Sequence, residues 1–261
     1  AMLGTTFHVN TDAELTPTKL YSEMMRIDAE AKASLSIFNP ESLLSRVNRG
    51  ETDSLDSHLI HNLSLARTLG EKYDTRYDVT VKPLTDAWGF AARNATANPN
   101  IDSLLQFVGY DKWSLNNNRV IRHDPRVQFD LNSIAKGYVV DLVAEALSKR
   151  GVESYMVNIG GEIRCQGMNP EGSEWHIGIE TPYEGNFEQN SLEKIIPVSN
   201  CAVATSGNYR RYYTSEDGLK VCHTINPKTG YSVHSNLLSA TVVAPTCAEA
   251  DAAATMFMAM G

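Results

Sequence analysis

Two oxygen-bearing side chains stand four positions apart near the end of the chain. Asp251 and Thr255 are separated by three alanines, and on a helix this spacing places both side chains on one face. A carboxylate and a hydroxyl are hard oxygen ligands of the kind that Mg2+ prefers. The same pair also fits an exposed aspartate beside a threonine that bonds back to its own helix. The spacing alone leaves both interpretations open.

A second segment that could carry chemistry joins a predicted strand to a predicted helix. Residues 129–131 predict the end of a strand, Asn132 or Ser133 is the candidate helix N-cap, and apolar residues then recur at helical spacing. A helix start presents unpaired N–H groups and the positive end of the helix dipole. Lys136 falls in the first turn and Asp130 just before it. This end suits a phosphate group, although most lysines are simply solvated.

Three shorter features lie in the second half of the chain. His223 opens the sequence HTINPKTG at the end of a predicted strand, and an imidazole there could take a proton near neutral pH or serve only the structure. Thr205 and Ser206 could bind phosphate or cap a turn. Gly160 and Gly161 would let the backbone approach a ligand closely or would form a bulge.

The composition excludes several classes of protein. The chain has 261 residues, 42% of them hydrophobic, and a net charge of -8, which argues against unspecific binding to nucleic acid or to an anionic membrane. No apolar run approaches the length of a membrane span. Four cysteines lie far apart without a C-x-x-C pair, so we expect buried thiols, and their even number leaves disulfides open. They are Cys165, Cys201, Cys222 and Cys247.

The first half of the chain alternates predicted helices with irregular segments. Residues 17–33, 56–73 and 101–108 have apolar residues at helical spacing. Residues 36–48 are polar and predict an irregular segment. Residues 77–90 contain a β-rich Val–Thr–Val followed by Pro83, and they predict a buried strand and loop rather than a helix.

The second half is rich in strands that turns separate, which favours an antiparallel sheet. Thr246 and Glu249 form a capping box ahead of a closing helix that runs to Gly261. We therefore predict a single α+β domain over residues 1–261, with helices packed on a largely antiparallel sheet. The predicted strands are residues 154–158, 162–166, 176–180, 194–198, 202–206, 220–225 and 238–244.

The segment FDLNSIAKGYVVD, residues 129–141, resembles the D-L-G-G-I-A-K-G-Y-A-x-D signature of the ApbE family, the FAD:protein FMN transferases. Other stretches match the same family in the same order and cover nearly the whole chain. They are LGTT at 3–6, SRVN at 45–48, YDVTV at 77–81 leading into WGF at 88–90, VNIGG at 157–161, HTINPKTG at 223–230 and the closing helix. The resemblance implies an ApbE-like (T-fold-like) α+β fold.

The resemblance also implies an activity, namely Mg2+-dependent transfer of FMN from FAD to a Ser or Thr hydroxyl of an acceptor flavoprotein, with release of AMP. Asp251, Thr255 and the main-chain carbonyl of Ser133 would bind Mg2+. His223 is the leading candidate for the general base, and Asp251 could share or take that role. The positions that match the family's FAD site are Leu3, Phe38, Arg76, Tyr77, Asp78, Asp130, Lys136, Gly160, Gly161, Thr205, Ser206 and Ile225.

Two departures from the family pattern keep other activities open. Asn132 and Ser133 replace the usual glycine pair, and Phe38 stands where many relatives carry Tyr. The alternatives are a Mg2+-dependent FAD pyrophosphatase that gives FMN and AMP, and a non-catalytic FAD-binding protein. The resemblance implies the bacterial periplasm, with membrane contact only through a lipid anchor on a leader that precedes this chain. The cytoplasm is the alternative, and no nucleic-acid partner is expected.

Overall fold

A five-stranded antiparallel sheet organises the fold. The computed structural model describes residues 1–14, 16–73, 76–90, 96, 99–182, 192–208, 212–214, 220–233 and 235–261. Every neighbouring pair of strands in the sheet is antiparallel, as the alternation of short strands and turns predicts. The strand order is β1 (Phe7–Thr11), β4 (Tyr155–Ile159), β5 (Glu162–Gln166), β8 (Cys201–Gly207) and β11 (Ser239–Ala244).

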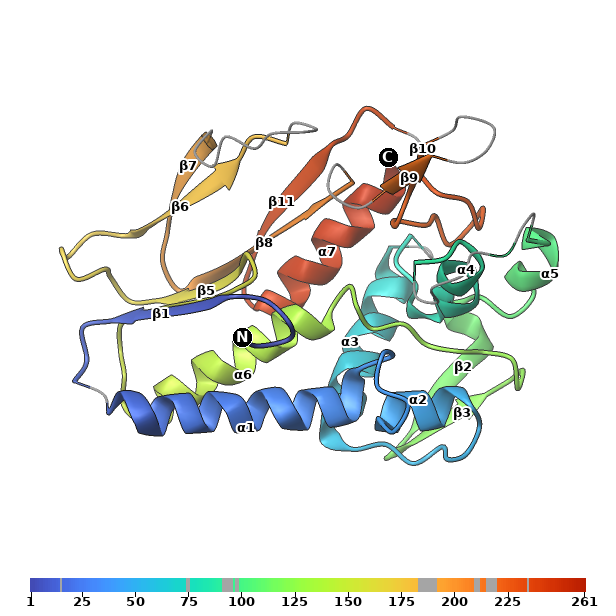
Figure 1. Cartoon of the computed structure of the whole chain (residues 1–261), viewed down its shortest axis with the longest axis horizontal. Coiled ribbons are helices and arrows are strands. Elements are labelled where there is room, and N and C mark those ends of the chain that lie inside the picture. The colour runs from blue at the N-terminus through green and yellow to red at the C-terminus, as the bar shows by residue number, and fades with distance from the viewer. Residues whose placement is uncertain are drawn as a thin grey trace.

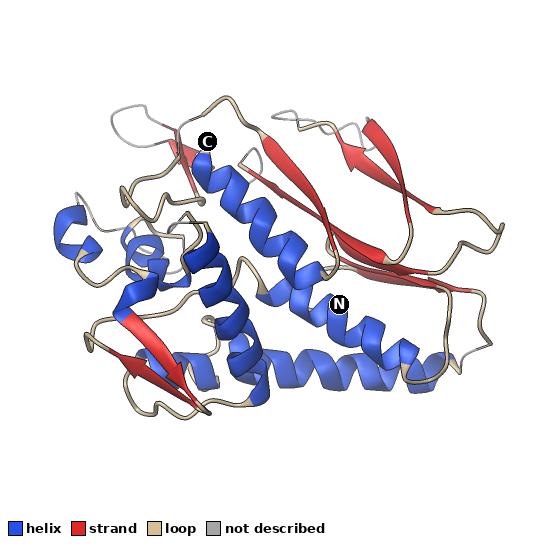
Figure 2. Ribbon diagram, turned by 180° about the vertical axis from the view of Figure 1, so that it is seen from behind, coloured by secondary structure: helices blue, strands red, loops and turns tan. Residues whose placement is uncertain are grey.

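Two helices cover one face of this sheet. α6 (Ala135–Ser148) packs on β4 and β5, while α7 (Cys247–Met260) packs on β8 and β11 and contacts α6 (Figure 1). α1 (Pro17–Leu35) packs against α6, and α3 (Ser57–Lys72) contacts both α1 and α7. Seen from behind, the helices and the sheet form separate layers (Figure 2).

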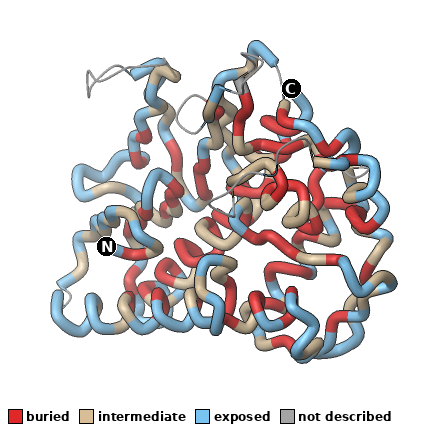
Figure 3. Tube along the Cα trace, turned by 45° about the vertical axis from the view of Figure 1, so that its right-hand side comes forward, coloured by how far each residue is buried: buried red, intermediate tan, exposed pale blue. Residues whose placement is uncertain are grey.

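The main core fills the space between these layers (Figure 3). On α6, Val139, Val143 and Leu147 recur at helical spacing and are fully buried. On β4, alternate residues face inward, which buries Val157 and Ile159 against the helix. None of the helices that the structure describes combines the length and the apolar character that a bilayer crossing requires.

Short elements surround the central layers. A hairpin of β6 (Trp175–Glu180) and β7 (Leu192–Val198) adds a small core of its own against β5 and β8. β2 (Trp113–Asn116) pairs with β3 (Arg119–Arg122), and β9 (Tyr212–Thr214) pairs with β10 (Lys220–Cys222). The remaining helices are α2 (Leu43–Asn48), α4 (Lys82–Ala87), α5 (Ile101–Leu105) and the 3₁₀ turns Val79–Val81 and Tyr110–Lys112.

The predicted fold class is confirmed. The helices predicted at residues 17–33 and 56–73 are α1 and α3, and the capping box before α7 forms, since the Glu249 N–H donates to Thr246 Oγ1 at 3.3 Å. Strand β9 was not predicted. All four cysteines are free thiols, and three of them are buried while Cys201 is half-buried.

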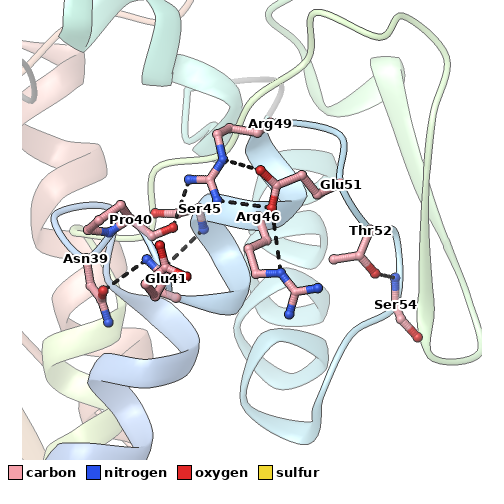
Figure 4. Close-up of polar contacts among 10 residues, drawn as sticks. Asn39, Pro40, Glu41, Ser45, Arg46, Arg49, Glu51, Thr52 and Ser54 are labelled. Carbon is pink, nitrogen blue, oxygen red and sulfur yellow. Dashed lines mark hydrogen bonds and ion pairs between the residues drawn. The ribbon is translucent and has the colours of Figure 1, made fainter.

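The prediction that residues 36–48 are irregular is wrong at their end, where α2 forms. Ser42 Oγ caps this helix by accepting a hydrogen bond from the Ser45 N–H at 3.0 Å, and Leu44 and Val47 fill the core. A six-residue helix is too short for its periodicity to stand out in the sequence. The end of α2 carries a surface ion cluster of Arg46, Arg49 and Glu51 (Figure 4).

The strand predicted within residues 77–90 is also wrong. The Asp78 carboxylate accepts hydrogen bonds from the Thr80 N–H and hydroxyl at 2.8 and 2.6 Å, and this starts the 3₁₀ turn Val79–Val81. α4 follows directly, with Pro83 in its first turn, where a missing N–H costs nothing. Local capping therefore overrides the β preference of Val–Thr–Val.

The segment before α6 corrects a third prediction. Residues 129–131 do not belong to a strand, and the Asn48 side chain pairs with both backbone groups of Phe129, at 2.7 and 2.9 Å. Helix α6 begins at Ala135 after Ile134, so neither Asn132 nor Ser133 is its N-cap. The reason is that Asp130 Oδ1 accepts the Asn132 N–H at 2.9 Å and holds a turn at this point.

Candidate functional site

Two cavities adjoin each other where α7 passes the start of α6. The first has a volume of ≈ 140 Å³ and the second ≈ 240 Å³. Both are lined by Asn132, His223 and Thr255, which form their common wall. Most of the predicted site residues line one or both of them. Arg76, Tyr77, Asp78, Asp130, Ser133 and Ile225 line the first, and Lys136, Gly160, Thr205, Ser206 and Asp251 line the second.

Three predicted residues do not line either cavity. Phe38 lies on the surface with 60% of its area exposed. Leu3 has a positive φ of 49° and donates its N–H to Asp28 Oδ1 at 2.7 Å. Gly161 follows Gly160 in the turn between β4 and β5 and donates its N–H to Asn158 Oδ1 at 3.0 Å. Their predicted contacts with FAD stay predictions.

The N-terminal turn nevertheless lies next to the site. Gly160 has a φ of 64°, and a side chain there would come within 2.6 Å of Thr5 Cγ2. Its N–H donates to the Thr6 carbonyl at 3.0 Å. A glycine is therefore required where the LGTT stretch packs on the wall of the second cavity.

Asp251 is fixed in a buried position by both helices. Its Oδ2 accepts the N–H of Gly137, in the first turn of α6, at 2.9 Å. Gly137 permits this contact, because a Cβ at that position would lie 2.2 Å from the Cys247 carbonyl oxygen. Burial, together with the negative charge of Glu162, raises the pKa of Asp251 well above its usual value. A cation beside this carboxylate would be stabilised.

Hydroxyl groups also line the two cavities. Thr255 Oγ1 lies 3.2 Å from Ser206 Oγ, which joins α7 to β8. Ser133 Oγ lies 2.9 Å from the Tyr77 hydroxyl, and burial raises the pKa of this tyrosine. Of the predicted metal-binding residues, Thr255 lies on the common wall, whereas Asp251 lines the second cavity and Ser133 lines the first.

The sequence prediction missed Glu162, the first residue of β5. Its side chain is 4% exposed, and its Oε1 lies 2.7 Å from Lys136 Nζ. Burial opposes the charge on Lys136, but the carboxylates of Glu162 and Asp251 outweigh it and raise the pKa of the lysine. Burial also raises the pKa of Glu162, since the lysine offsets only part of this effect. A glutamate directly after a glycine pair, at the start of a buried strand, was the available signal.

The first cavity combines aromatic and apolar walls with two buried acids. Tyr77, Phe90 and Ile225 contribute to its lining. Asp130 Oδ2 accepts a hydrogen bond from the Thr85 hydroxyl at 3.2 Å, and burial raises its pKa. Burial also raises the pKa of Asp78 to about 6, and its Oδ2 is buried without a hydrogen-bond partner. This cavity suits a flat ring system that also offers a hydrogen-bond donor.

His223 stands between the two cavities. It directly follows β10, and its ring makes an edge-on contact with Phe90 at a centroid distance of 6.3 Å. Because it lines both cavities, its imidazole can act on a group placed at their junction.

The donor set of the second cavity fits magnesium rather than zinc. Within the described part of the chain, no three His, Cys, Asp or Glu side chains are grouped as a metal site, so a cation at Asp251 would also need hydroxyl or carbonyl oxygens as ligands. The oxygens of Asp251 and Thr255 are hard ligands, and two buried carboxylates face a single lysine in this cavity. The excess of negative charge favours a small divalent cation.

Fold and site together define an α+β enzyme with a two-part ligand cavity. The model of the ApbE family matches residues 3–261. The FAD:protein FMN transferase of Haemophilus influenzae is 36% identical and covers 99% of this chain and 79% of its own length, and that of Vibrio cholerae is 34% identical over 93% and 73%. The chain belongs to the ApbE family.

Solved structures agree with this assignment. The flavin transferase ApbE from Vibrio cholerae superposes with a TM-score of 0.84 at 32% identity, over 100% of this chain and 85% of that one. The apo flavinyl transferase ApbE of Pseudomonas stutzeri has a TM-score of 0.86 at 28% identity, over 100% and 82%. These comparisons confirm the resemblance, the fold class and the prediction that the chain is an enzyme.

Proposed function

We propose that this protein transfers FMN from FAD to a Ser or Thr hydroxyl of an acceptor flavoprotein, with Mg2+ as cofactor and AMP as the second product. One observation carries the proposal. Three distant parts of the chain contribute residues to two adjoining cavities, and each of these residues lines at least one of them. They are Ser133 and Lys136, His223, and Asp251 and Thr255. The names of the relatives from Haemophilus influenzae and Vibrio cholerae support FAD as the substrate.

The two cavities differ as the two parts of a flavin nucleotide differ. The first has aromatic and apolar walls, which suit the isoalloxazine ring. The second is lined by hydroxyl groups and by Lys136, in the first turn of α6, which suit phosphates. The reacting phosphorus would then lie near the common wall, beside His223.

The proposed reaction is a phosphoryl transfer. The acceptor hydroxyl oxygen attacks the phosphorus of the FMN half, the bond from that phosphorus to the bridging oxygen breaks, and AMP leaves with that oxygen. His223 takes the hydroxyl proton, and Asp251 is the alternative base. Lys136 offsets the charge of the phosphates. Mg2+, bound by Asp251, Thr255 and the carbonyl of Ser133, would supply electrostatic stabilisation of the charge that develops on the phosphate oxygens.

Hydrolysis of FAD to FMN and AMP is the second candidate. The first cavity is lined by Asn132 and Ser133, at the positions where the family pattern has glycines, and their side chains reduce the space for an acceptor segment. Storage of FAD without turnover is the third candidate. The buried acid pair of the second cavity argues against storage, since Lys136 offsets only part of its cost and a bound cation would offset the rest.

One incubation separates these candidates. The protein is mixed with FAD and Mg2+, with or without an acceptor domain that carries a Ser/Thr flavinylation motif, and AMP and protein-bound fluorescence are followed. A fluorescent acceptor together with AMP is the expected result. AMP and free FMN without a labelled acceptor would support hydrolysis, and neither product would support storage. An acceptor with its hydroxyl residue replaced by alanine is the control.

The cellular location stays part of the proposal. Family resemblance is its support, and it favours the bacterial periplasm, with the cytoplasm as the alternative. Fractionation of cells that express the full-length protein tests it, and recovery in the cytoplasmic fraction would overturn it.

A further inference from the structure

Glu162 has an unusual position for a charged residue. It is 3% exposed, it lines the second cavity beside Asp251 and Thr255, and it lies at the inner face of the sheet. One carboxylate oxygen contacts Lys136 Nζ at 2.7 Å, whereas the other, Oε2, is buried without a hydrogen-bond partner. A buried, half-satisfied carboxylate is costly and requires a reason.

The charges in this cavity are unbalanced. Among the described residues that line it, Glu162 and Asp251 are acidic and Lys136 alone carries a permanent positive charge. The lysine interacts electrostatically with both carboxylates, and only Glu162 contacts it directly. If Glu162 lost its charge, Asp251 would remain as the acidic partner in the cavity. The ammonium group would then move toward the carboxylate that the cation needs.

We propose that Glu162 is a positioning residue that holds the ammonium group of Lys136 away from Asp251 and thereby sets the affinity of the Asp251–Thr255 site for Mg2+. This inference rests on the proposed function, because it presupposes a cation at Asp251. It adds to that function a division of labour between two buried acids. Asp251 binds the cation, while Glu162 keeps the lysine from competing with it.

The test is a calorimetric titration of the FAD-free protein with Mg2+ alone. Four proteins are compared: the wild type, Glu162→Gln, Lys136→Gln and the double variant. Glu162→Gln should weaken Mg2+ binding about tenfold or more, because the released ammonium group of Lys136 moves closer to the cation site. In the Lys136→Gln background the same substitution should have an effect several-fold smaller, because no lysine remains to compete.

Equal effects in the two backgrounds would overturn the inference, since Glu162 would then act only through its own charge. Glu162→Asp provides a second test. It keeps the charge but is one methylene group too short for the 2.7 Å contact, so we expect weaker Mg2+ binding, and wild-type affinity would contradict us. Glu145→Gln is the matched control, because it removes the exposed acidic partner of Lys149 on α6, the helix that carries Lys136. Circular dichroism confirms that each variant is folded.

The outcome also separates this inference from the proposed function. Asp251→Asn should abolish the Mg2+ signal in the same titration. If Asp251→Asn binds Mg2+ normally, the cation site itself is wrong. If it loses binding while the Glu162 and Lys136 substitutions are additive, only the positioning role fails.

Discussion

Two groups of charged residues in this molecule have ion pairs of similar length, but the pKa values of their carboxylates shift in opposite directions. In the surface ion cluster, Glu51 lies 2.6 Å from Arg49, and about half of each side chain is exposed (Figure 4). The hydrogen bond from Arg49 lowers the pKa of Glu51. In the second cavity, Glu162 lies 2.7 Å from Lys136, yet burial raises the pKa of Glu162 and of Asp251.

The difference shows that contact distance alone does not indicate the role of an ion pair. Exposed pairs are solvated and screened, and they contribute little to stability or function. Buried carboxylates that lack full compensation are destabilising, and they persist where they bind something. We therefore expect substitutions in the second cavity to change activity strongly and substitutions in the surface ion cluster to change almost nothing.

The largest effect is expected for Asp251→Asn. The amide oxygen can still accept the Gly137 N–H, so the helix contact survives while the charge that binds Mg2+ is lost. Turnover of FAD should fall by a factor on the order of 10³, because electrostatic stabilisation by a metal is worth several kcal/mol. AMP release measured at saturating Mg2+ checks this. Asp102→Asn, at an exposed position in α5, is the control. A rate near that of the wild type would show that Asp251 does not bind a catalytic metal.

His223→Gln should have the next largest effect. Loss of a general base lowers the rate by a factor of about 10² to 10⁴, whereas Mg2+ binding should remain, because His223 is not among the proposed ligands. Single-turnover transfer of FMN, together with Mg2+ calorimetry, measures both properties. An unchanged rate would indicate that Asp251, rather than His223, accepts the proton of the acceptor hydroxyl. His176→Gln is the control, because this exposed histidine lies on β6, outside both cavities.

The part of the site that is local in sequence could be predicted. Helical spacing places Asp251 and Thr255 on one face, and α7 confirms that both line the second cavity. Helical spacing could not identify Glu162, because its partner Lys136 lies on another element and the preceding glycine pair marks only the start of a strand. Phe38, matched to the FAD site by resemblance, is on the surface.

The fold shows the same limit. Antiparallel strands and long helices follow from periodicity, which is a local property. Residues 77–90 instead form the 3₁₀ turn Val79–Val81 and α4, because the Asp78 side chain caps the turn and overrides the β preference, which periodicity does not reveal. Gly137 appears in the sequence only as a helix residue. Its role becomes visible when the Cys247 carbonyl is seen to occupy the space of its missing side chain.

A smaller effect is expected for Asp78→Asn in the first cavity. Burial raises the pKa of Asp78 from 3.8 to about 6, so folding binds a proton between these values and wild-type stability falls as the pH rises through this window. Asparagine does not titrate in this range. The free energy of unfolding of the Asp78→Asn variant, relative to that of the wild type, should therefore increase by about 1 kcal/mol between pH 5 and pH 8. Urea unfolding at both pH values measures this difference, and pH-independent behaviour would show that Asp78 is not a costly buried charge.

The smallest effect is expected for Glu51→Gln in the surface ion cluster. Because Arg49 lowers the pKa of Glu51 in the folded protein, any stabilisation is present above the ordinary value of 4.5 and is lost as the pH falls below it. Both partners are well exposed, so the melting temperature at neutral pH should stay within experimental scatter of the wild type and FMN transfer should be unchanged. A clear loss of stability would break the comparison, because an exposed pair would then matter as much as the buried one.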